Sequence, residues 1–365
     1  MIHHQVLIVG GGEAGLSVAG QLLKESPGLD VAIIEPLEYH DFQQLWLMAG
    51  AGVIQPGECR RDKASLMPQG ALWVKDAVCA FDPGSNSLRT ASGQTVSYNF
   101  LVVAPGIQSK WERVPGLCES LGRDGVCSAY SPQTLIATWN NIQRFTGGVA
   151  LFTQPAGVIK CPSGSQQMCF MAEEHFRQTG VRDKTQMIFV SGAASLFPVA
   201  QYAQELEQLA KDKGVQVNLE LNLVEVRAAS KQAVFRHVVS GEERVIGYDL
   251  LHVAPPMGPF DFVAQSDLAD QVGLVDVDPY TLRHHRFPNV FSLGDAANLP
   301  TTKTAVAIRK QAPVLATNLI AALERRPLTA KYDGFSLCLI MAGYNSVLRT
   351  EVDYSLWPGP GAAAR

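Results

Sequence analysis

Charged side chains are scarce in this chain, at 18% of its 365 residues against roughly 25% in an average globular protein. This shortage excludes a disordered chain, which needs far more charge. The charges that are present nearly cancel, because 30 basic and 34 acidic side chains give a net charge of −4. Nucleic-acid binding requires a basic surface, so we expect no nucleic-acid partner.

Long apolar runs are also missing. No uncharged apolar stretch reaches the roughly 18 residues that a membrane-spanning helix requires. The apolar segment 6–23 contains Glu13 and several glycines, and no basic segment precedes it, so it does not resemble a signal peptide. We therefore expect a soluble intracellular protein that is attached to a membrane at most peripherally.

The seven cysteines form no pattern of a known structural kind. Their number is odd, no two are spaced as Cys-x-x-Cys, and no Cys/His group has zinc-ligand spacing. We therefore expect neither a disulfide framework nor a metal site. Most of these cysteines are expected to be small buried apolar side chains, with one or two active in redox chemistry.

The first 35 residues alternate strands and a helix. The apolar run 5–9 predicts a buried strand, the periodicity of 16–24 predicts a helix, and 30–35 predicts a second strand. This order implies a right-handed crossover and a parallel sheet. Further strands are predicted at 72–74 and 100–104.

A glycine pattern connects the first strand to the first helix. Gly10 permits a tight turn, Gly12 lets the backbone approach a pyrophosphate, and Gly15 allows the helix to pack closely on the sheet. The helix N-terminus then offers free N–H groups to the phosphates. Glu35 follows Gly15 by 20 residues, where a carboxylate binds ribose hydroxyls. We predict a dinucleotide site, with a purely structural glycine turn as the alternative.

A second α/β region begins near residue 147, and the first resumes near residue 280. Strands are predicted at 147–153, 186–191, 215–225, 233–239, 250–254 and 290–293, and helices at 165–178, at 199–213 and from about residue 302. The segment 332–354 looks strand-like, and 357–361 is expected to be a loop. The predicted fold class is α/β, with two Rossmann-like dinucleotide-binding domains, the first of them discontinuous, and a β-containing C-terminal segment. The expected ranges are 1–110 and 281–325 for the first domain, 111–280 for the second, and 326–365 for the C-terminal segment.

Two features bear on which dinucleotide binds. Asp295 follows Gly294 after a late strand, and in two-dinucleotide-domain flavoproteins such an aspartate contacts the ribityl chain of the flavin, which favours FAD. An ordinary aspartate turn or helix cap is the alternative. No second glycine fingerprint follows the strand at 147–153 or the strand at 186–191. This suggests that the electrons do not come from a nicotinamide.

Cys161 lies in the loop where that second fingerprint would stand. Its neighbour Lys160 and a helix predicted to begin at 163–165 would both lower the pKa of the thiol and make it a better nucleophile. A buried, inert cysteine is the alternative. The position of Cys338 by itself indicates nothing beyond a core residue.

Several segments together resemble the sulfide:quinone oxidoreductases, and most of all their mitochondrial-type (type II) branch. These segments run in the family's order over nearly the whole chain: 10–15, Glu35-Pro36, His40-x-x-Gln43, 104–108, Ile159-Lys-Cys161, 288–295, Asn298-Leu-Pro-Thr-Thr-Lys-Thr304 and Tyr332-Asp-Gly-Phe-Ser-Leu-Cys338. The last two are far more specific than the glycine pattern.

The resemblance implies an FAD-dependent enzyme that oxidises hydrogen sulfide and passes the electrons to a quinone. Cys161 and Cys338 match the family's two catalytic cysteines, which form a disulfide or sulfur-bridged pair beside the flavin. Hydrosulfide would attack this bridge and leave a persulfide on one cysteine, and two electrons would pass to the flavin. The sulfane sulfur would go to a small acceptor such as a thiol, sulfite or a second sulfide.

The resemblance also implies which residues contact FAD. These residues are Glu13 and Ala14 at the phosphates, Glu35 at the ribose, Gln43, Val78 at the adenine, Asp295 at the ribityl chain, and Lys303, Thr304, Ala305 and Val306 at the pyrimidine edge of the flavin. A helix N-terminus or a lysine at that edge would stabilise a reduced, anionic flavin. For Lys303, a solvated surface lysine is the alternative.

Two features differ from the family pattern. Mitochondrial-type members have amphipathic helices beyond the point where this sequence stops, and these helices attach to the membrane. We therefore expect docking on the cytoplasmic side of the membrane to use another apolar patch, to be weak, or to be absent. Cys169 is an additional cysteine, expected in a helical core, and Cys127 is either a third assisting thiol or a core residue. The competing functions are a type II NADH:quinone dehydrogenase and a flavin-containing persulfide or redox sensor without sustained turnover.

Overall fold

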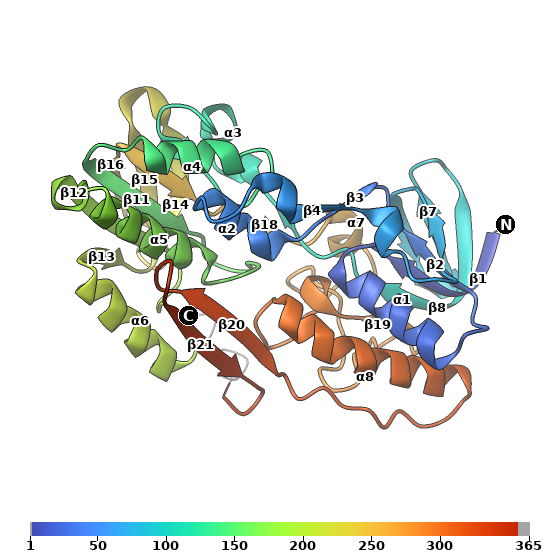
Figure 1. Ribbon diagram of the computed structural model, residues 1–365. Coiled ribbons are helices and arrows are strands. Elements are labelled where there is room, and N and C mark those ends of the chain that lie inside the picture. Colours follow the sequence, from blue (N-terminus) through green and yellow to red (C-terminus); the bar gives the residue numbers. More distant parts are fainter. Residues whose placement is uncertain (1, 357–365) are drawn as a thin grey trace.

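Two sheets, the first mixed and the second parallel, form the two halves of the molecule in a computed structural model that describes residues 2–356 (Figure 1). The first sheet has the strand order β5-β2-β1-β8-β7-β6, with β19 paired to β8. Its strands are β1 (Ile2–Val9), β2 (Val31–Ile34), β5 (Leu72–Val74), β6 (Val78–Asp82), β7 (Ser87–Thr90), β8 (Thr95–Val103) and β19 (Val290–Ser292). The pairings among β5, β2, β1, β8 and β19 are parallel. The chain therefore returns to the first sheet after the second sheet is complete.

Helix α1 (Glu13–Glu25) and helix α8 (Ala305–Leu323) lie side by side along the first sheet (Figure 1). Residues 31–34 of β2 are completely buried, which explains their uninterrupted apolar sequence. The predicted helix at about residue 302 begins at Ala305, because the Thr304 side chain accepts a hydrogen bond from Ala307 N at 3.2 Å and caps the helix.

The second sheet is entirely parallel, in the order β10-β17-β11-β12-β13. It contains β10 (Val126–Cys127), β11 (Gly148–Gln154), β12 (Thr185–Ser191), β13 (Val215–Asn218) and β17 (Leu250–Val253), with helices α4 (Leu135–Gln143), α5 (Gly164–Gln178) and α6 (Ala200–Asp212). The strands and helices predicted in this half are confirmed to within a few residues, with one exception.

The exception is the single strand predicted at 215–225. The structure has two strands there, β13 and β14 (Leu221–Arg227), because Glu220 takes a left-handed conformation (φ 58°) that interrupts the strand. Strand β14 belongs to a separate antiparallel sheet with β15 (Gln232–His237) and β16 (Glu243–Gly247). An apolar run shows that a segment is buried, but not that its backbone changes sheet within the run.

The strand-like segment 332–354 forms the hairpin β20 (Ser336–Met341) and β21 (Val347–Val352). Strand β20 packs against both α5 and α8, so it lies between the two halves (Figure 1). The predicted loop at 357–361 lies outside the described residues. The domain boundaries expected at residues 110, 280 and 325 stay predictions.

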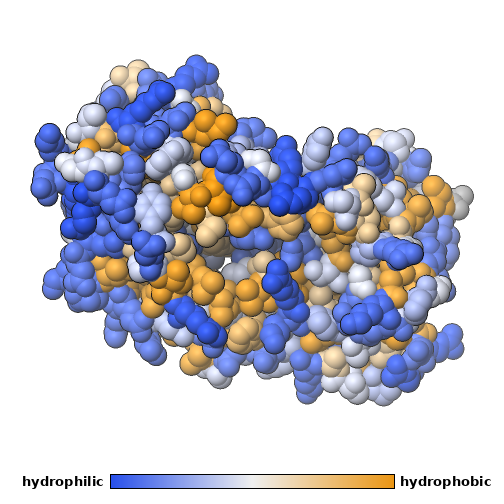
Figure 2. Space-filling view, in the orientation of Figure 1, coloured by the Kyte–Doolittle hydropathy of each residue, from blue (hydrophilic) through white to orange (hydrophobic). Residues whose placement is uncertain are grey.

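The shorter elements are β3 (Tyr39–Asp41), β4 (Arg60–Asp62), β9 (Gln108–Ser109), β18 (Met257–Gly258), α2 (Trp46–Gly50), α3 (Leu117–Ser120) and α7 (Asp261–Ala264). Figure 2 shows apolar side chains gathered around a hollow in the middle of this face, where the two halves meet. Within residues 2–356, no helix combines the length and apolar character that crossing a bilayer requires.

Candidate active site

Two cysteines 177 positions apart in the sequence contact the same short segment of the chain. Cys161 lies between β11 and α5, and its backbone N–H donates to the carbonyl oxygen of Lys303 at 3.3 Å. Cys338 lies on β20, and its sulfur donates to Oγ1 of the adjacent Thr302 at 3.7 Å. The charge of a Cys338 thiolate also contributes to the raised pKa of Cys161. The fold thus brings the two predicted catalytic residues together as free thiols.

The backbone at Cys161 has a conformation that is rare for a residue with a side chain. Its φ is +50°, in the left-handed region. The carbonyl oxygen of Cys161 accepts from Gly164 N at 2.8 Å and from the Tyr130 hydroxyl at 3.5 Å, which holds the turn in place. Non-glycine residues in this region cost roughly 1–3 kcal/mol and cluster at functional sites.

The expected lowering of the Cys161 pKa is wrong. Burial raises the pKa of this thiol to about 12, and the negative charges of Cys338 and Asp295 add to the effect. Lys160 does not offset it, because its ammonium group lies over the Trp46 ring, 5.9 Å from the centroid, and burial lowers its own pKa. Desolvation between the two halves therefore outweighs the neighbouring charge that sequence position suggested.

A chain of hydroxyl groups leads from Cys338 to the start of α8. Thr302 Oγ1 lies 2.5 Å from Ser336 Oγ, and Ser336 Oγ lies 2.8 Å from Thr304 Oγ1, the N-cap of α8. Burial raises the pKa of Cys338, while the hydrogen bonds of its thiol to Thr302 and Thr350 act in the opposite direction. Sequence reasoning missed Thr302 and Ser336, although both lie inside the two most specific family segments.

The glycine loop after β1 forms an open cradle. A Cβ atom at Gly10 (φ +101°) would lie 2.4 Å from the carbonyl oxygen of Ala104, and one at Gly15 would lie 1.9 Å from that of Gly10. A Cβ atom at Gly12 would meet no atom within 4 Å, and Gly12 is the N-cap of α1, so no side chain caps this helix. The N–H groups of α1 therefore face open space beside Gly12, as a pyrophosphate site requires.

Glu35 lies at the end of β2, directly beside this cradle. Its Oε2 accepts from Gly11 N at 2.8 Å and pairs with Nζ of Lys63 at 3.2 Å, and its Oε1 accepts from Leu37 N at 2.8 Å. Lys63 is almost completely buried, and this burial lowers its pKa even though Glu35 opposes the effect. Sequence reasoning missed Lys63, because nothing in the sequence relates it to Glu35.

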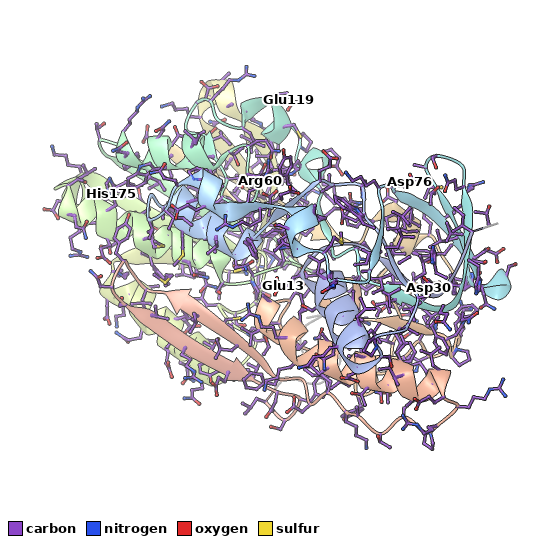
Figure 3. The ribbon with its side chains drawn as sticks, turned by 45° about the vertical axis from the view of Figure 1, so that its right-hand side comes forward. Glu13, Asp30, Arg60, Asp76, Glu119 and His175 are labelled. Carbon is purple, nitrogen blue, oxygen red and sulfur yellow. The ribbon has the colours of Figure 1, made fainter. Side chains whose placement is uncertain are left out.

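A second helix N-terminus converges on the same region. A Cβ atom at Gly294 (φ +69°) would lie 3.2 Å from that of Ala14 in α1 and 3.4 Å from Cγ1 of Ile308 in α8. Glu13, the first residue of α1, lies near the middle of the molecule in Figure 3. A small pocket at this point is lined by residues that include Gly294, Asp295, Thr302, Lys303, Thr304 and Gln311.

Lys303 is not a solvated surface lysine. Its ammonium group donates to the carbonyl oxygens of Asp295 at 2.7 Å and Ala297 at 3.1 Å. Burial of this group lowers its pKa, with the charge of Asp295 acting against the shift. The alternative role is therefore wrong, and Lys303 connects the Gly294–Asp295 turn to the segment that contacts both cysteines.

The other predicted site residues lie in varied surroundings. Gln43 is exposed at the start of a 3-10 helix (Gln43–Leu45), Val78 is buried at the start of β6, and Ala305 and Val306 are the first two residues of α8. Their contacts with a cofactor stay predictions.

The two additional cysteines, Cys127 in β10 and Cys169 in α5, are buried. Among residues 2–356, no three His, Cys, Asp or Glu side chains gather as a metal site.

The connection after β11 of the second sheet differs from the glycine loop of the first sheet. It is open beside Gly157, where a Cβ atom would meet no atom within 4 Å, and it lines a pocket that also contains Lys110 and Arg113. Residues 155–163 separate β11 from α5, whereas only residues 10–12 separate β1 from α1. The first turn of α5 is crowded, since a Cβ atom at Gly164 would lie 2.5 Å from the Tyr130 hydroxyl oxygen. After β12, a Cβ atom at Gly192 would lie 2.4 Å from Ala156 N. The loop that carries Cys161 thus stands where a phosphate loop would be.

Comparison with solved structures gives the same fold. A chain in the structure of the mitochondrial ATP synthase of Tetrahymena thermophila superposes with a TM-score of 0.88 at 22% identity, over 97% of this chain and 87% of that one. The sulfide:quinone oxidoreductase of Aquifex aeolicus superposes with a TM-score of 0.79 at 16% identity, over 98% and 88%. NDH2 of Plasmodium falciparum superposes with a TM-score of 0.69 at 12% identity, over 96% and 91%. These similarities show the two-dinucleotide-domain flavoprotein fold.

Sequence comparison with characterised proteins defines the family, although no family model matches. The mitochondrial sulfide:quinone oxidoreductase of Dictyostelium discoideum is 42% identical over 353 residues, which cover 96% of this chain and 78% of the relative. The mitochondrial enzyme of the same name from Mus musculus is 39% identical over 98% of this chain and 79% of its own length. Because these identities extend over nearly all of this chain, the chain belongs to the sulfide:quinone oxidoreductase family.

Proposed function

We propose that this chain is an FAD-dependent enzyme that oxidises hydrogen sulfide and passes the electrons to a quinone. The observation that carries the proposal is the meeting of Cys161 and Cys338 on residues 302–303, beside Asp295 and the N-terminus of α8. The names of the relatives, sulfide:quinone oxidoreductases at about 40% identity, give the substrate pair.

The residues of the two convergent helix N-termini fit FAD. The open cradle at Gly12 would hold the pyrophosphate, Glu35 the ribose, and the Gly294–Asp295 turn the ribityl chain. When bound, the flavin supplies a two-electron acceptor that is later reoxidised by quinone. The dipole of α8 and the ammonium group of Lys303 place positive charge at the same end of the pocket.

Cys161 and Cys338 act as a disulfide in the proposed reaction. Hydrosulfide attacks one sulfur, so the disulfide bond breaks, a persulfide forms on that cysteine, and the other cysteine leaves as a thiolate. A small acceptor (a thiol, sulfite or a second hydrosulfide) removes the outer sulfur and leaves a second thiolate. The pair would then return to the disulfide by giving up its two electrons, which a bound flavin would accept and a quinone would finally receive.

The oxidation state of the pair decides which group is the nucleophile. While the pair is a disulfide, neither cysteine carries a thiol, so the attacking species is the external hydrosulfide anion. In the reduced pair, burial raises the pKa of Cys161 to about 12. A buried thiolate is also costly, which favours its return to the disulfide once a two-electron acceptor is present.

We place the enzyme at the cytoplasmic side of the cell membrane through peripheral contact, because the quinone is dissolved in the bilayer. A cytoplasmic enzyme that meets the membrane only transiently is the alternative. Binding of the protein to liposomes, with and without quinone, distinguishes the two.

Anaerobic addition of sulfide tests the proposed function. The purified holoprotein should lose its visible flavin absorbance, and Cys161→Ser and Cys338→Ser should each abolish this loss. Cys79→Ser is the matched control, because Cys79 is exposed on β6 and its thiol donates only to the carbonyl oxygen of Arg89. Full flavin reduction by sulfide in either active-site variant would refute the mechanism.

A redox sensor without turnover is the competing function. Sustained, sulfide-dependent reduction of decylubiquinone by wild-type protein excludes it. If sulfide reduces the flavin once but the protein does not reduce quinone continuously, the sensor hypothesis is correct and the assignment of quinone as electron acceptor is wrong.

A further inference from the structure

One buried side chain joins the two cysteine segments. Gln167, the fourth residue of α5, is 5% exposed. Its Nε2 lies 3.9 Å from the sulfur of Cys161 and 3.3 Å from Oγ of Ser163. Its Oε1 accepts a hydrogen bond from the backbone N–H of Met341 at 3.2 Å, and Met341 is on β20, the strand of Cys338.

The orientation of this amide is set by its partners. The backbone N–H of Met341 can only donate, so the amide oxygen of Gln167 must face it. The NH2 group must then face the sulfur of Cys161. Neither glutamate nor lysine satisfies both contacts, because a carboxylate offers only acceptors and an ammonium group only donors.

We infer that Gln167 is a positioning residue for the redox pair, which holds an N–H donor on the sulfur of Cys161 and fixes the Cys161 loop to the strand of Cys338. This inference rests on the proposed function and assigns a role within the same site. A donor at this position stabilises negative charge on the sulfur, and it is fixed before the charge forms.

Other ionisable groups also surround the Cys161 sulfur. They are Cys338 on β20, Asp295 in the turn after β19 and Tyr130 before α4. Lys160 precedes Cys161 in the chain and the backbone of Lys303 bonds to it, but their ammonium groups lie over Trp46 and on the carbonyl oxygens of Asp295 and Ala297. Among the contacts of this sulfur, the Gln167 amide is the one that lowers the pKa of Cys161. Because these other groups are the same in every Gln167 variant, differences among the variants report on position 167.

The test compares thiol reactivity in Gln167→Glu, wild type and Gln167→Lys. Fully reduced holoprotein is treated with methyl methanethiosulfonate between pH 7 and pH 10, and labelling of Cys161 relative to Cys338 is followed by peptide mass spectrometry. Thiolate is the reactive form, so Gln167→Glu should lower the Cys161:Cys338 rate ratio roughly tenfold and Gln167→Lys should raise it roughly tenfold, which is about one pKa unit each way. An introduced charge acts on the thiol whatever the native side chain does, so the deciding variant is Gln167→Met, which removes the N–H donor without adding a charge. Gln167→Met should also lower the ratio, and an unchanged ratio in this variant would overturn the inference.

Gln166→Glu is the matched control. Gln166 is the neighbouring buried residue on α5, but its Nε2 donates to the carbonyl oxygen of Leu196 at 2.7 Å. This variant should leave the ratio unchanged. An equal ratio in the two charged Gln167 variants, or a Cys161 that stays unlabelled in all proteins, overturns the inference. The measurement uses no sulfide or quinone, so its failure is distinct from failure of the proposed function.

Discussion

Single glycines in the β1–α1 loop have separable roles. Gly12 has φ −82°, which every residue can adopt, and a Cβ atom there would meet only open space. Gly12→Val should therefore fold normally yet lose FAD, because the branched side chain would enter the cradle at the N-terminus of α1. We expect an unchanged melting temperature of the apoprotein and at least a roughly tenfold weaker FAD affinity, measured by fluorescence titration.

Gly28→Val is the control for this prediction. Gly28 lies in the exposed turn after α1, and a Cβ atom there also meets no atom within 4 Å. The Gly28→Val variant should bind FAD with the affinity of the wild type. Normal FAD affinity of Gly12→Val would show that the pyrophosphate lies elsewhere.

The partly buried thiol of Cys161 makes stability depend on pH. The pKa of this thiol in the folded protein is about 12, above the ordinary value of 9.0. Its contribution to the free energy of unfolding is therefore complete below pH 9 and is lost as the pH rises toward 12. When both cysteines are reduced, ionisation of this thiol in the unfolded chain should lower the free energy of unfolding by about 1.4 kcal/mol per pH unit above pH 9. Cys161→Ser should remove that part of the slope in urea unfolding at pH 8, 9 and 10. An identical slope in Cys161→Ser, with exposed Cys79→Ser as reference, would contradict the raised pKa.

At the scale of elements, local patterns predicted most of the fold and only part of the site. Strands β1 and β2, helix α1 and the start of α5 follow from periodicity and from glycine positions, and the structure confirms them. No local pattern predicted the contacts that join residues far apart in the sequence. These contacts are the hydrogen bonds of Thr302, Ser336 and Gln167 and the pairing of Lys63 with Glu35. The sign of the Cys161 pKa shift was mispredicted for the same reason, since burial is a property of the assembled halves.

Helix α5 is anchored at its far end by a completely buried carboxylate. Glu173 pairs with Arg177 on α5, with Arg182 at 3.2 Å and with Lys213 after α6 at 3.1 Å. Removing one side of a buried ion pair leaves the partners uncompensated, so Glu173→Gln should lower the free energy of unfolding by about 3 kcal/mol in urea titrations. Exposed Glu205→Gln on α6 should change it by less than about 0.5 kcal/mol. Equal stabilities of the two variants would show that the cluster contributes nothing.

Both halves of the molecule contain a core of parallel strands, but they differ at the position where each could bind a dinucleotide. We expect this difference to determine the electron donor. In the first half, α1 begins directly after the glycine loop and its N-terminus is open at Gly12. In the second half, residues 155–163 precede α5, Gly164 N is already bonded to the carbonyl oxygen of Cys161, and a Cβ atom at Gly164 would lie 2.5 Å from the Tyr130 hydroxyl oxygen. NADH in stopped flow should therefore reduce the flavin at least roughly a hundredfold more slowly than sulfide at equal concentration, because the pyrophosphate would have no helix N-terminus to bind. Flavin reduction by NADH at a rate comparable to that by sulfide, and equally fast in Cys161→Ser, would instead identify a type II NADH:quinone dehydrogenase.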